Sequence, residues 1–169
     1  MSRDDVRNSV LPAYMGMIKQ IDDEIGRLVK FLDERGQMDH TMIIFTSDHG
    51  DYLGDHWLGE KDLFHEPSVR IPFIVCDPNK EADKTRGTSS NELVEAIDVV
   101  PTILEAVGGY PQPHILDGRA LQSLLYGEKL IDWRKYVISE YDYSFMNARI
   151  DLDMPSRECW LRMVFDGRF

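Results

Sequence analysis

The residues best suited to chemistry follow directly on the stretch Thr41 to Ser47, which has the character of a buried strand. Asp48, His49 and Gly50 come next, so a carboxylate and an imidazole stand at the carboxyl end of that strand. In open α/β sheets, ligands bind in the crevice beyond such strand ends. We expect Gly50 to allow a sharp turn that lets the two side chains converge. Asp48 and His49 are therefore candidate ligands of one divalent metal ion.

Two ligands do not complete a metal site, so the remaining ligands must come from elsewhere. A set that mixes oxygen and nitrogen favours Mn²⁺ or Zn²⁺ over Ca²⁺, which prefers oxygen ligands throughout. The alternative interpretation is structural, because an aspartate in an Asp-His-Gly turn can cap that turn through its own side chain.

The polar loop after this turn carries further candidates. Lys61 could return over the strand end and hold an anionic oxygen of a substrate, although it could also be a solvated surface lysine. His56 and His65 are candidate proton donors or hydrogen-bond donors to the residues that bind the metal, and exposed histidines without a function are the alternative. Glu66 and Arg70 have the spacing of a structural ion pair, and Arg70 is also a candidate for lining a substrate pocket.

Composition bounds the function. The chain has 169 residues and 43% apolar residues, enough for one domain with a core. Its formal net charge of −11 argues against binding to nucleic acid, and a phosphate or sulfate substrate would need local cations such as Lys61 and Arg70. No stretch approaches a membrane span, the first residues do not resemble a signal peptide, and Cys76 and Cys159 are expected to be reduced thiols in strands. These features predict a cytoplasmic protein.

The elements around the turn can be predicted from hydrophobic spacing. Apolar residues from Tyr14 onward recur at helical intervals and predict an amphipathic helix that stops at Gly36. The strand at 41–47 lacks alternation, which is typical of a parallel strand covered on both faces, and 71–76 predicts a second strand of this kind.

The second half of the chain predicts shorter elements. Asp98 is expected to N-cap a helix over residues 99–107, and a short helix is expected around 121–125. Strands are predicted at 136–140 and 159–165, and the two could pair as an antiparallel hairpin. So few helices could not cover these strands, which indicates that the chain is cut from something larger or packs against another copy of itself.

The ordered pattern SDHGD-x-LGDH-x-x-x-x-K, followed by Glu66, Arg70 and a strand that opens with Ile-Pro, resembles the sulfatase branch of the alkaline phosphatase superfamily. The closer resemblance is to the phosphonate monoester hydrolases, and it extends to the helix before the motif and to the segments at 95–104 and 139–143. It implies an α/β fold, an alkaline-phosphatase-like mixed sheet flanked by helices, of which this chain is a C-terminal portion. Residues 1–130 would end the main domain, and 131–169 would begin a C-terminal antiparallel sheet subdomain.

The resemblance also implies a reaction and roles for residues. Asp48 and His49 would bind a single divalent metal, while Lys61 would contact the sulfate or phosphoryl oxygens of a small anionic ester during hydrolysis. The nucleophile in such enzymes is a hydrated formylglycine made from a cysteine in Cys-x-(Ser/Pro)-x-Arg. Neither Cys76 nor Cys159 fits that motif, so formylglycine is expected in a missing N-terminal part and the chain alone is expected to be inactive.

Two alternatives to this hydrolase stay open at this point. One is a non-catalytic assembly or interaction module that keeps the fold and joins a partner or itself. The other is a phosphodiesterase or phosphotransferase of the same superfamily with a Ser or Thr nucleophile. The sequence does not choose between sulfate and phosphonate substrates, and a homo-oligomer or packing against a missing N-terminal half is expected in either case.

Overall fold

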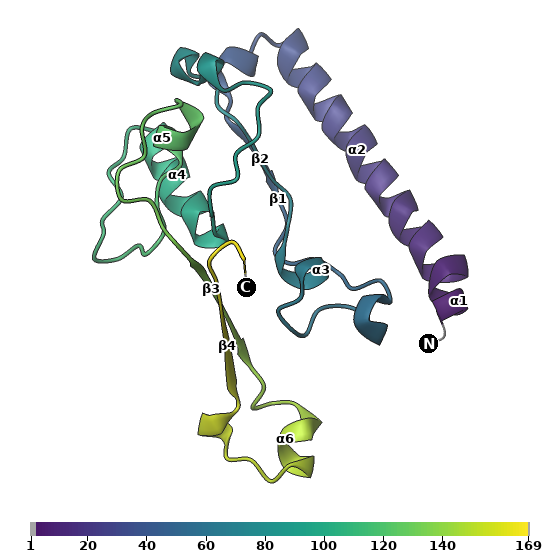
Figure 1. The fold of residues 1–169 in the computed structure, drawn as a ribbon. Coiled ribbons are helices and arrows are strands. Elements are labelled where there is room, and N and C mark those ends of the chain that lie inside the picture. Colours follow the sequence, from purple (N-terminus) through teal and green to yellow (C-terminus); the bar gives the residue numbers. More distant parts are fainter. Residues whose placement is uncertain (1–2, 169) are drawn as a thin grey trace.

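A computed structural model describes residues 3–168. The chain begins with a helical rod made of α1 (Arg3–Asp5), a π-helical turn (Val6–Val10) and α2 (Leu11–Glu34) (Figure 1). The predicted amphipathic helix is confirmed. It starts before Tyr14 because Pro12 fits the first turn of a helix, and it ends where Gly36 adopts a left-handed φ of 62°.

Strands β1 (Ile43–Thr46) and β2 (Phe73–Cys76) pair with each other and are antiparallel, with Ile43 opposite Cys76 and Thr46 opposite Phe73. The prediction of parallel strands is therefore wrong for this pair. A parallel neighbour needs a long crossover, whereas the segment between β1 and β2 contains only short helices and returns to the strand end that it left.

Cover on both faces of this pair is also absent among the described residues. Phe45 is 36% exposed and Ile74 is 62% exposed, so one face of each strand has little packed against it. A continuous apolar run predicts a strand that is covered on both faces, and within residues 3–168 little covers the second face.

Three short helices follow or connect these strands: α3 (Glu66–Val69), α4 (Val99–Ala106) and α5 (Gln122–Leu125). The helices predicted at 99–107 and 121–125 are confirmed as α4 and α5, which pack against each other beside β2 and β3 (Figure 1).

The last elements form a separate antiparallel ribbon. Strands β3 (Val137–Asp142) and β4 (Trp160–Phe165) pair along their full lengths, and α6 (Asn147–Asp151) lies in the connection at the far end of the ribbon (Figure 1). The predicted hairpin is confirmed. Cys76 ends β2 as expected, whereas Cys159 precedes β4, and both cysteines are free.

Asp98 does not cap α4 with its side chain, so that prediction is wrong. Its carboxylate is fully buried and accepts hydrogen bonds from both terminal nitrogens of Arg134, at 2.7 and 2.6 Å. The backbone amides of Glu95 and Arg119 also donate to it, at 2.8 and 2.7 Å. The buried guanidinium and carboxylate thus join the segment before α4 to the segment before β3, across the predicted boundary at residue 130.

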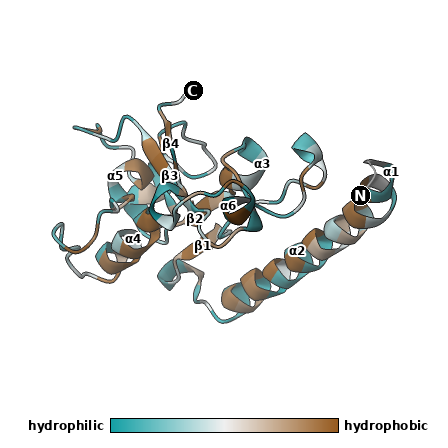
Figure 2. Ribbon diagram, turned by 90° about the horizontal axis from the view of Figure 1, so that it is seen from below, coloured by the Kyte–Doolittle hydropathy of each residue, from teal (hydrophilic) through white to brown (hydrophobic). Residues whose placement is uncertain are grey.

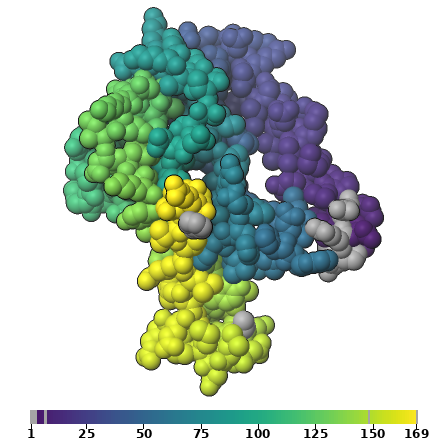
Figure 3. Space-filling model, viewed as in Figure 1, coloured from purple at the N-terminus to yellow at the C-terminus, as the bar shows by residue number. Residues whose placement is uncertain are grey.

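Much apolar surface of α2 is uncovered. Leu32 is the one residue of α2 that is buried, while its exposed apolar side chains include Met15, Met17, Ile18, Ile21, Leu28 and Phe31. Figure 2 shows hydrophobic residues along the ribbon of this helix, and Figure 3 shows openings between the helix and the chain behind it. None of the helices within residues 3–168 combines the length and apolar character that crossing a membrane requires.

Candidate metal and substrate site

The candidate site lies where β1 ends and the chain turns into the loop before α3. The imidazole of His49 donates from Nδ1 to the carbonyl oxygen of Gly50 at 2.8 Å, which leaves Nε2 as an acceptor. Oδ2 of Asp48 lies 3.4 Å from that Nε2. A carboxylate oxygen and an imidazole lone pair therefore converge, as predicted from the sequence.

The carboxylate of Asp48 is exposed and is held by the backbone. The amide of His49 donates to its Oδ1 at 3.0 Å, and this hydrogen bond is the main cause that lowers the pKa of Asp48 below its usual value. The positive charges that His49 and Lys61 can carry lower that pKa further. Asp48 is thus an anionic oxygen donor over the whole neutral pH range.

Lys61 reaches the same place from the far side of the loop. Its Nζ lies 2.5 Å from Nε2 of His49, so the ammonium donates to the nitrogen that the Gly50 contact leaves free. A cation already faces the imidazole and the carboxylate of Asp48 in this arrangement. The sequence prediction that Lys61 returns over the strand end is therefore borne out by the geometry.

Gly50 is needed for space and not for an unusual backbone angle. Its amide donates to the carbonyl oxygen of Ser68 at 2.8 Å, which draws the turn against α3. A Cβ at position 50 would lie 1.9 Å from the carbonyl oxygen of Pro67, which no real side chain can tolerate. Gly50 has no positive φ, so the sequence-based reason given for this glycine is replaced by close packing.

Tyr52, in the first part of the loop, contacts two residues in its second part. It is 1% exposed, its amide donates to the carbonyl oxygen of Glu60 at 2.9 Å, and its hydroxyl lies 2.9 Å from Nδ1 of His65. These two contacts lie on either side of Lys61 in the chain. Sequence reasoning missed Tyr52, because no local pattern distinguishes a buried loop tyrosine from an exposed one.

The tip of the loop holds several left-handed residues that are not glycine. Leu53, His56, Trp57 and Glu60 have φ between 47° and 62°, and Gly54 has φ of 92°. Side chains rarely adopt this region, and such backbone persists where the surroundings enforce it. The loop therefore has one defined shape.

The structure brings His56 to His65 and not to the metal candidates. The two rings stack with centroids 4.0 Å apart, and both meet Tyr52 edge-on. Within residues 3–168, no hydrogen bond, ion pair or ring contact joins His56 to Asp48, His49 or Lys61, so its catalytic role stays a prediction. The hydroxyl of Tyr52 contacts Nδ1 of His65, and the role of His65 as a donor stays a prediction.

Arg70 and Glu66 form the predicted ion pair at 2.9 Å, with Glu66 at the first position of α3 and Arg70 just after its last. The carboxylate of Glu66 raises the pKa of Arg70 through this hydrogen bond. Both side chains are largely exposed, so the pair contributes little to stability. Gly50 contacts Ser68 in α3, and Arg70 follows the last residue of that helix. The role of Arg70 in substrate binding stays a prediction.

The donor set fits a divalent metal in part. The oxygen of Asp48 and Nε2 of His49 converge, and the Gly50 contact fixes the tautomer that leaves Nε2 free, as in many metal-binding histidines. Within residues 3–168 no group of three or more His, Cys, Asp or Glu side chains gathers as a metal site. The described residues therefore offer two candidate ligands, and a complete site needs more.

Neither cysteine can serve as the nucleophile at this place. Cys76 pairs with Ile43, at the opposite end of β1 from Asp48, and a strand of this length separates its ends by about 10 Å. Cys159 is buried just before β4, at the far end of the C-terminal ribbon. The geometry agrees with the absence of the conversion motif around both residues.

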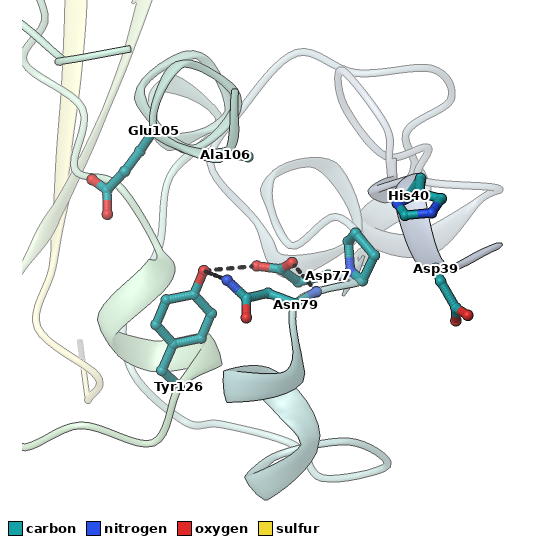
Figure 4. Close-up of a pocket in the computed structure, with 8 residues that line it drawn as sticks. Asp39, His40, Asp77, Asn79, Glu105, Ala106 and Tyr126 are labelled. Atoms are coloured by element: carbon teal, nitrogen blue, oxygen red, sulfur yellow. Dashed lines mark hydrogen bonds between the residues drawn. The ribbon is translucent and has the colours of Figure 1, made fainter. Parts of the chain in front are cut away.

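A separate depression of about 330 Å³ lies at that opposite end of the β1–β2 pair (Figure 4). Asp77, on its floor, accepts from the amide of Asn79 at 2.8 Å and from the hydroxyl of Tyr126 at 3.2 Å. Burial, with Asp77 nearby, raises the pKa of Tyr126. These polar groups satisfy one another, and exposed His40 lines the same depression, away from the candidate site.

The sulfatase family model matches residues 2–110, which include the whole loop and both candidate ligands. The chain belongs to the sulfatase family. The multifunctional alkaline phosphatase superfamily protein PehA of Trinickia caryophylli is 45% identical over 159 residues, covering 92% of this chain and 30% of that protein. An arylsulfatase of Clostridium perfringens is 35% identical over 131 residues, covering 78% of this chain and 27% of that enzyme.

Solved structures agree with this family. A phosphonate monoester hydrolase of Agrobacterium radiobacter superposes with a TM-score of 0.83 at 32% identity, covering 92% of this chain and 31% of that one. The phosphonate monoester hydrolase SpPMH from Silicibacter pomeroyi gives a TM-score of 0.84 at 33% identity, with the same coverage. The fold is thus the α/β, alkaline-phosphatase-like fold expected from the sequence. The chain spans about 30% of the length of these relatives.

Proposed function

We propose that the full-length gene product is a metal-dependent hydrolase of sulfate esters, phosphonate monoesters or phosphodiesters. The observation that supports this proposal best is the convergence of Asp48, His49 and Lys61 at the end of β1. These are two metal ligands and one cation, in a chain whose relatives are named as sulfatases and phosphonate monoester hydrolases.

Asp48 and His49 would hold the metal ion, with Mn²⁺ or Zn²⁺ favoured over Ca²⁺ by the mixed donor set. When bound, the ion would neutralise charge on the ester oxygens and activate the nucleophile. That nucleophile is proposed to be a formylglycine outside residues 1–169. The hydrogen bond from Nδ1 to the carbonyl of Gly50 selects the tautomer of the neutral ring that carries its lone pair on Nε2, the atom that would bind the metal.

Lys61 would bind a non-bridging oxygen of the substrate. Its ammonium donates to Nε2 of His49 in the structure, so a metal that takes this lone pair would leave the ammonium free to turn to an anionic oxygen nearby. A fixed cation at this point stabilises the charge that develops in the transition state. His56 is proposed as a proton donor and Arg70 as a second contact for the anionic substrate.

The test is an assay of the full-length gene product on an aryl sulfate, a phenyl phosphonate monoester and a phosphodiester, each with Mn²⁺, Zn²⁺ or Ca²⁺. We expect hydrolysis of at least one substrate and its loss in Asp48→Ala. Asp55→Ala, which changes an exposed carboxylate of the same loop, is the matched control and should keep full activity. Equal activity of Asp48→Ala and wild type would contradict the metal assignment.

The second candidate function is a non-catalytic assembly module, as a homo-oligomer or with another polypeptide. It is favoured by the exposed apolar side chains of α2, of which Met15 is 58% and Ile21 is 51% exposed. A helix with one face in water normally buries its apolar side chains, so this much exposed apolar surface indicates a face that another element or chain would cover. A defined oligomer without bound metal, by light scattering and elemental analysis, and without hydrolysis would favour this candidate.

A further inference from the structure

Lys61 has an exposed, flexible side chain, so its position at His49 depends on how the backbone around it is held. On one side, the carbonyl oxygen of Glu60 accepts a hydrogen bond from the amide of buried Tyr52 at 2.9 Å. Glu60 itself is left-handed, with φ of 55°, so this contact fixes an unfavourable backbone conformation. The segment is thus anchored immediately before Lys61.

The anchor immediately after Lys61 comes from a distant part of the chain. The hydroxyl of Tyr141, on β3, donates to Oδ1 of Asp62 at 3.1 Å. The ring of Tyr141 packs against the rings of Tyr143 and Phe145, at centroid distances of 5.1 and 6.2 Å. The pairing of β3 with β4 and these aromatic contacts hold the side chain of Tyr141, and so its hydroxyl, in one position.

We infer that Tyr141 is a positioning residue of the catalytic loop, which holds Asp62 so that Lys61 stays directed at the metal and substrate site. This inference rests on the proposed function of Lys61. Glu60 and Asp62 are both adjacent to Lys61 in sequence, and the carboxylate of Asp62 is the one that the hydroxyl of Tyr141 engages. Loss of that hydroxyl would free Asp62 to attract Lys61 and would release the segment on its carboxyl side.

The state of Tyr141 suits this role. Burial and the hydrogen bond to Asp62 raise its pKa, so the phenol keeps its proton and its donor capacity at neutral pH and well above. The contact is therefore expected to persist over the whole pH range of an assay.

The experiment uses the full-length gene product with the substrate that it hydrolyses best. We expect Tyr141→Phe to lower kcat about three- to tenfold with KM nearly unchanged, the scale of one lost hydrogen bond. Tyr136→Phe is the matched control, because that exposed residue lies just before β3 and its hydroxyl makes no hydrogen bond to residues 3–168. It should behave as wild type.

The decisive comparison repeats Tyr141→Phe in a Lys61→Ala background. If Tyr141 acts through Lys61, it should have no further effect there, whereas a merely structural role would lower activity equally in both backgrounds and overturn the inference. An unchanged kcat in the single Tyr141→Phe variant would overturn it as well.

A second readout separates this inference from the proposed function. In ¹⁵N-histidine-labelled protein without metal, Tyr141→Phe should shift the Nε2 resonance of His49, because the Lys61 donor moves, while Tyr136→Phe should not. Absence of hydrolysis by wild type together with this shift would reject the proposed function and keep the positioning role. Absence of the shift would reject the positioning role whatever the activity.

Discussion

The ammonium nitrogen of Lys61 lies 2.5 Å from Nε2 of His49, although twelve positions separate the two residues in sequence. Because Nδ1 of the same imidazole donates to the carbonyl of Gly50, the ring offers this one lone pair to any cation at the site. A divalent metal and Lys61 would therefore compete for Nε2, and metal binding would redirect the lysine. This competition links the metal candidates to the substrate candidate.

The first prediction follows from that shared lone pair. His49→Ala should weaken metal binding to the full-length gene product by more than about 100-fold, since even loss of an outer partner of a ligand costs up to that much. Isothermal titration with Mn²⁺ and Zn²⁺ measures it. His40→Ala removes an exposed imidazole at the other end of β1 and should bind metal as wild type does. Equal affinity in both variants would show that His49 is not a ligand.

The second prediction concerns the contact between Gly50 and α3. Gly50→Ala places a Cβ 1.9 Å from the carbonyl oxygen of Pro67, so the Asp-His-Gly turn or α3 must move. Overpacking of this kind costs about 1–3 kcal/mol, and the displaced His49 should also lower hydrolysis more than tenfold. Unfolding curves and the ester assay give both values.

Gly59→Ala is the matched control for this change. It lies in the same loop, no atom lies within 4 Å of its added Cβ, and its φ is not in the left-handed region. Both stability and activity should stay near wild type. A harmless Gly50→Ala would mean that the turn does not lie against Pro67.

The third prediction is a pH effect at Asp48. The amide of His49 lowers the pKa of this carboxyl, so its ¹³C NMR titration should have a midpoint below the usual range of an aspartate. With a lowered native pKa, the unfolded chain binds more protons between the two pKa values. The contribution to stability is therefore present above the usual pKa and is lost as the pH falls through the native one.

Ser47→Ala provides the control for that titration. The Ser47 hydroxyl donates to the carbonyl oxygen of His49 at 2.5 Å and lies 3.5 Å from Oδ1 of Asp48, at the limit of a hydrogen bond, whereas the His49 amide donates to that oxygen at 3.0 Å. Removal of the hydroxyl should leave the low midpoint in place. A midpoint at the usual value in wild type would show that the amide does not face the carboxylate.

Local patterns predicted the helix α2, the strand ends and the converging Asp48 and His49, because each depends on residues close together in the chain. The orientation of β1 relative to β2 could not be predicted, because a continuous apolar run indicates burial without saying which partner supplies it. The contact of Tyr141 with Asp62 spans 79 positions, and no sequence signal joins them. Asp98 was misassigned for the same reason, since its partner Arg134 lies 36 positions away.

The final prediction tests that buried pair. The side chain of Arg134 is 7% exposed and that of Asp98 is fully buried, so Arg134→Met would leave a carboxylate without its cation in a dry environment. Breaking such a pair costs about 3–5 kcal/mol. Urea unfolding of the variant should show a loss of this size, together with loosening of the segment before β3, which the Arg134 contact joins to α4.

Arg162→Ala, which removes an exposed ion pair, is the control for the loss of the buried pair. Arg162 pairs with Glu140 across the ribbon at 2.6 Å, but the two side chains are 69% and 47% exposed, so water screens the pair. Its loss should cost less than about 1 kcal/mol. If both variants lost the same small amount, the carboxylate of Asp98 would have to be reached by water or to carry a proton. The buried guanidinium would then not be what holds the two halves of the chain together.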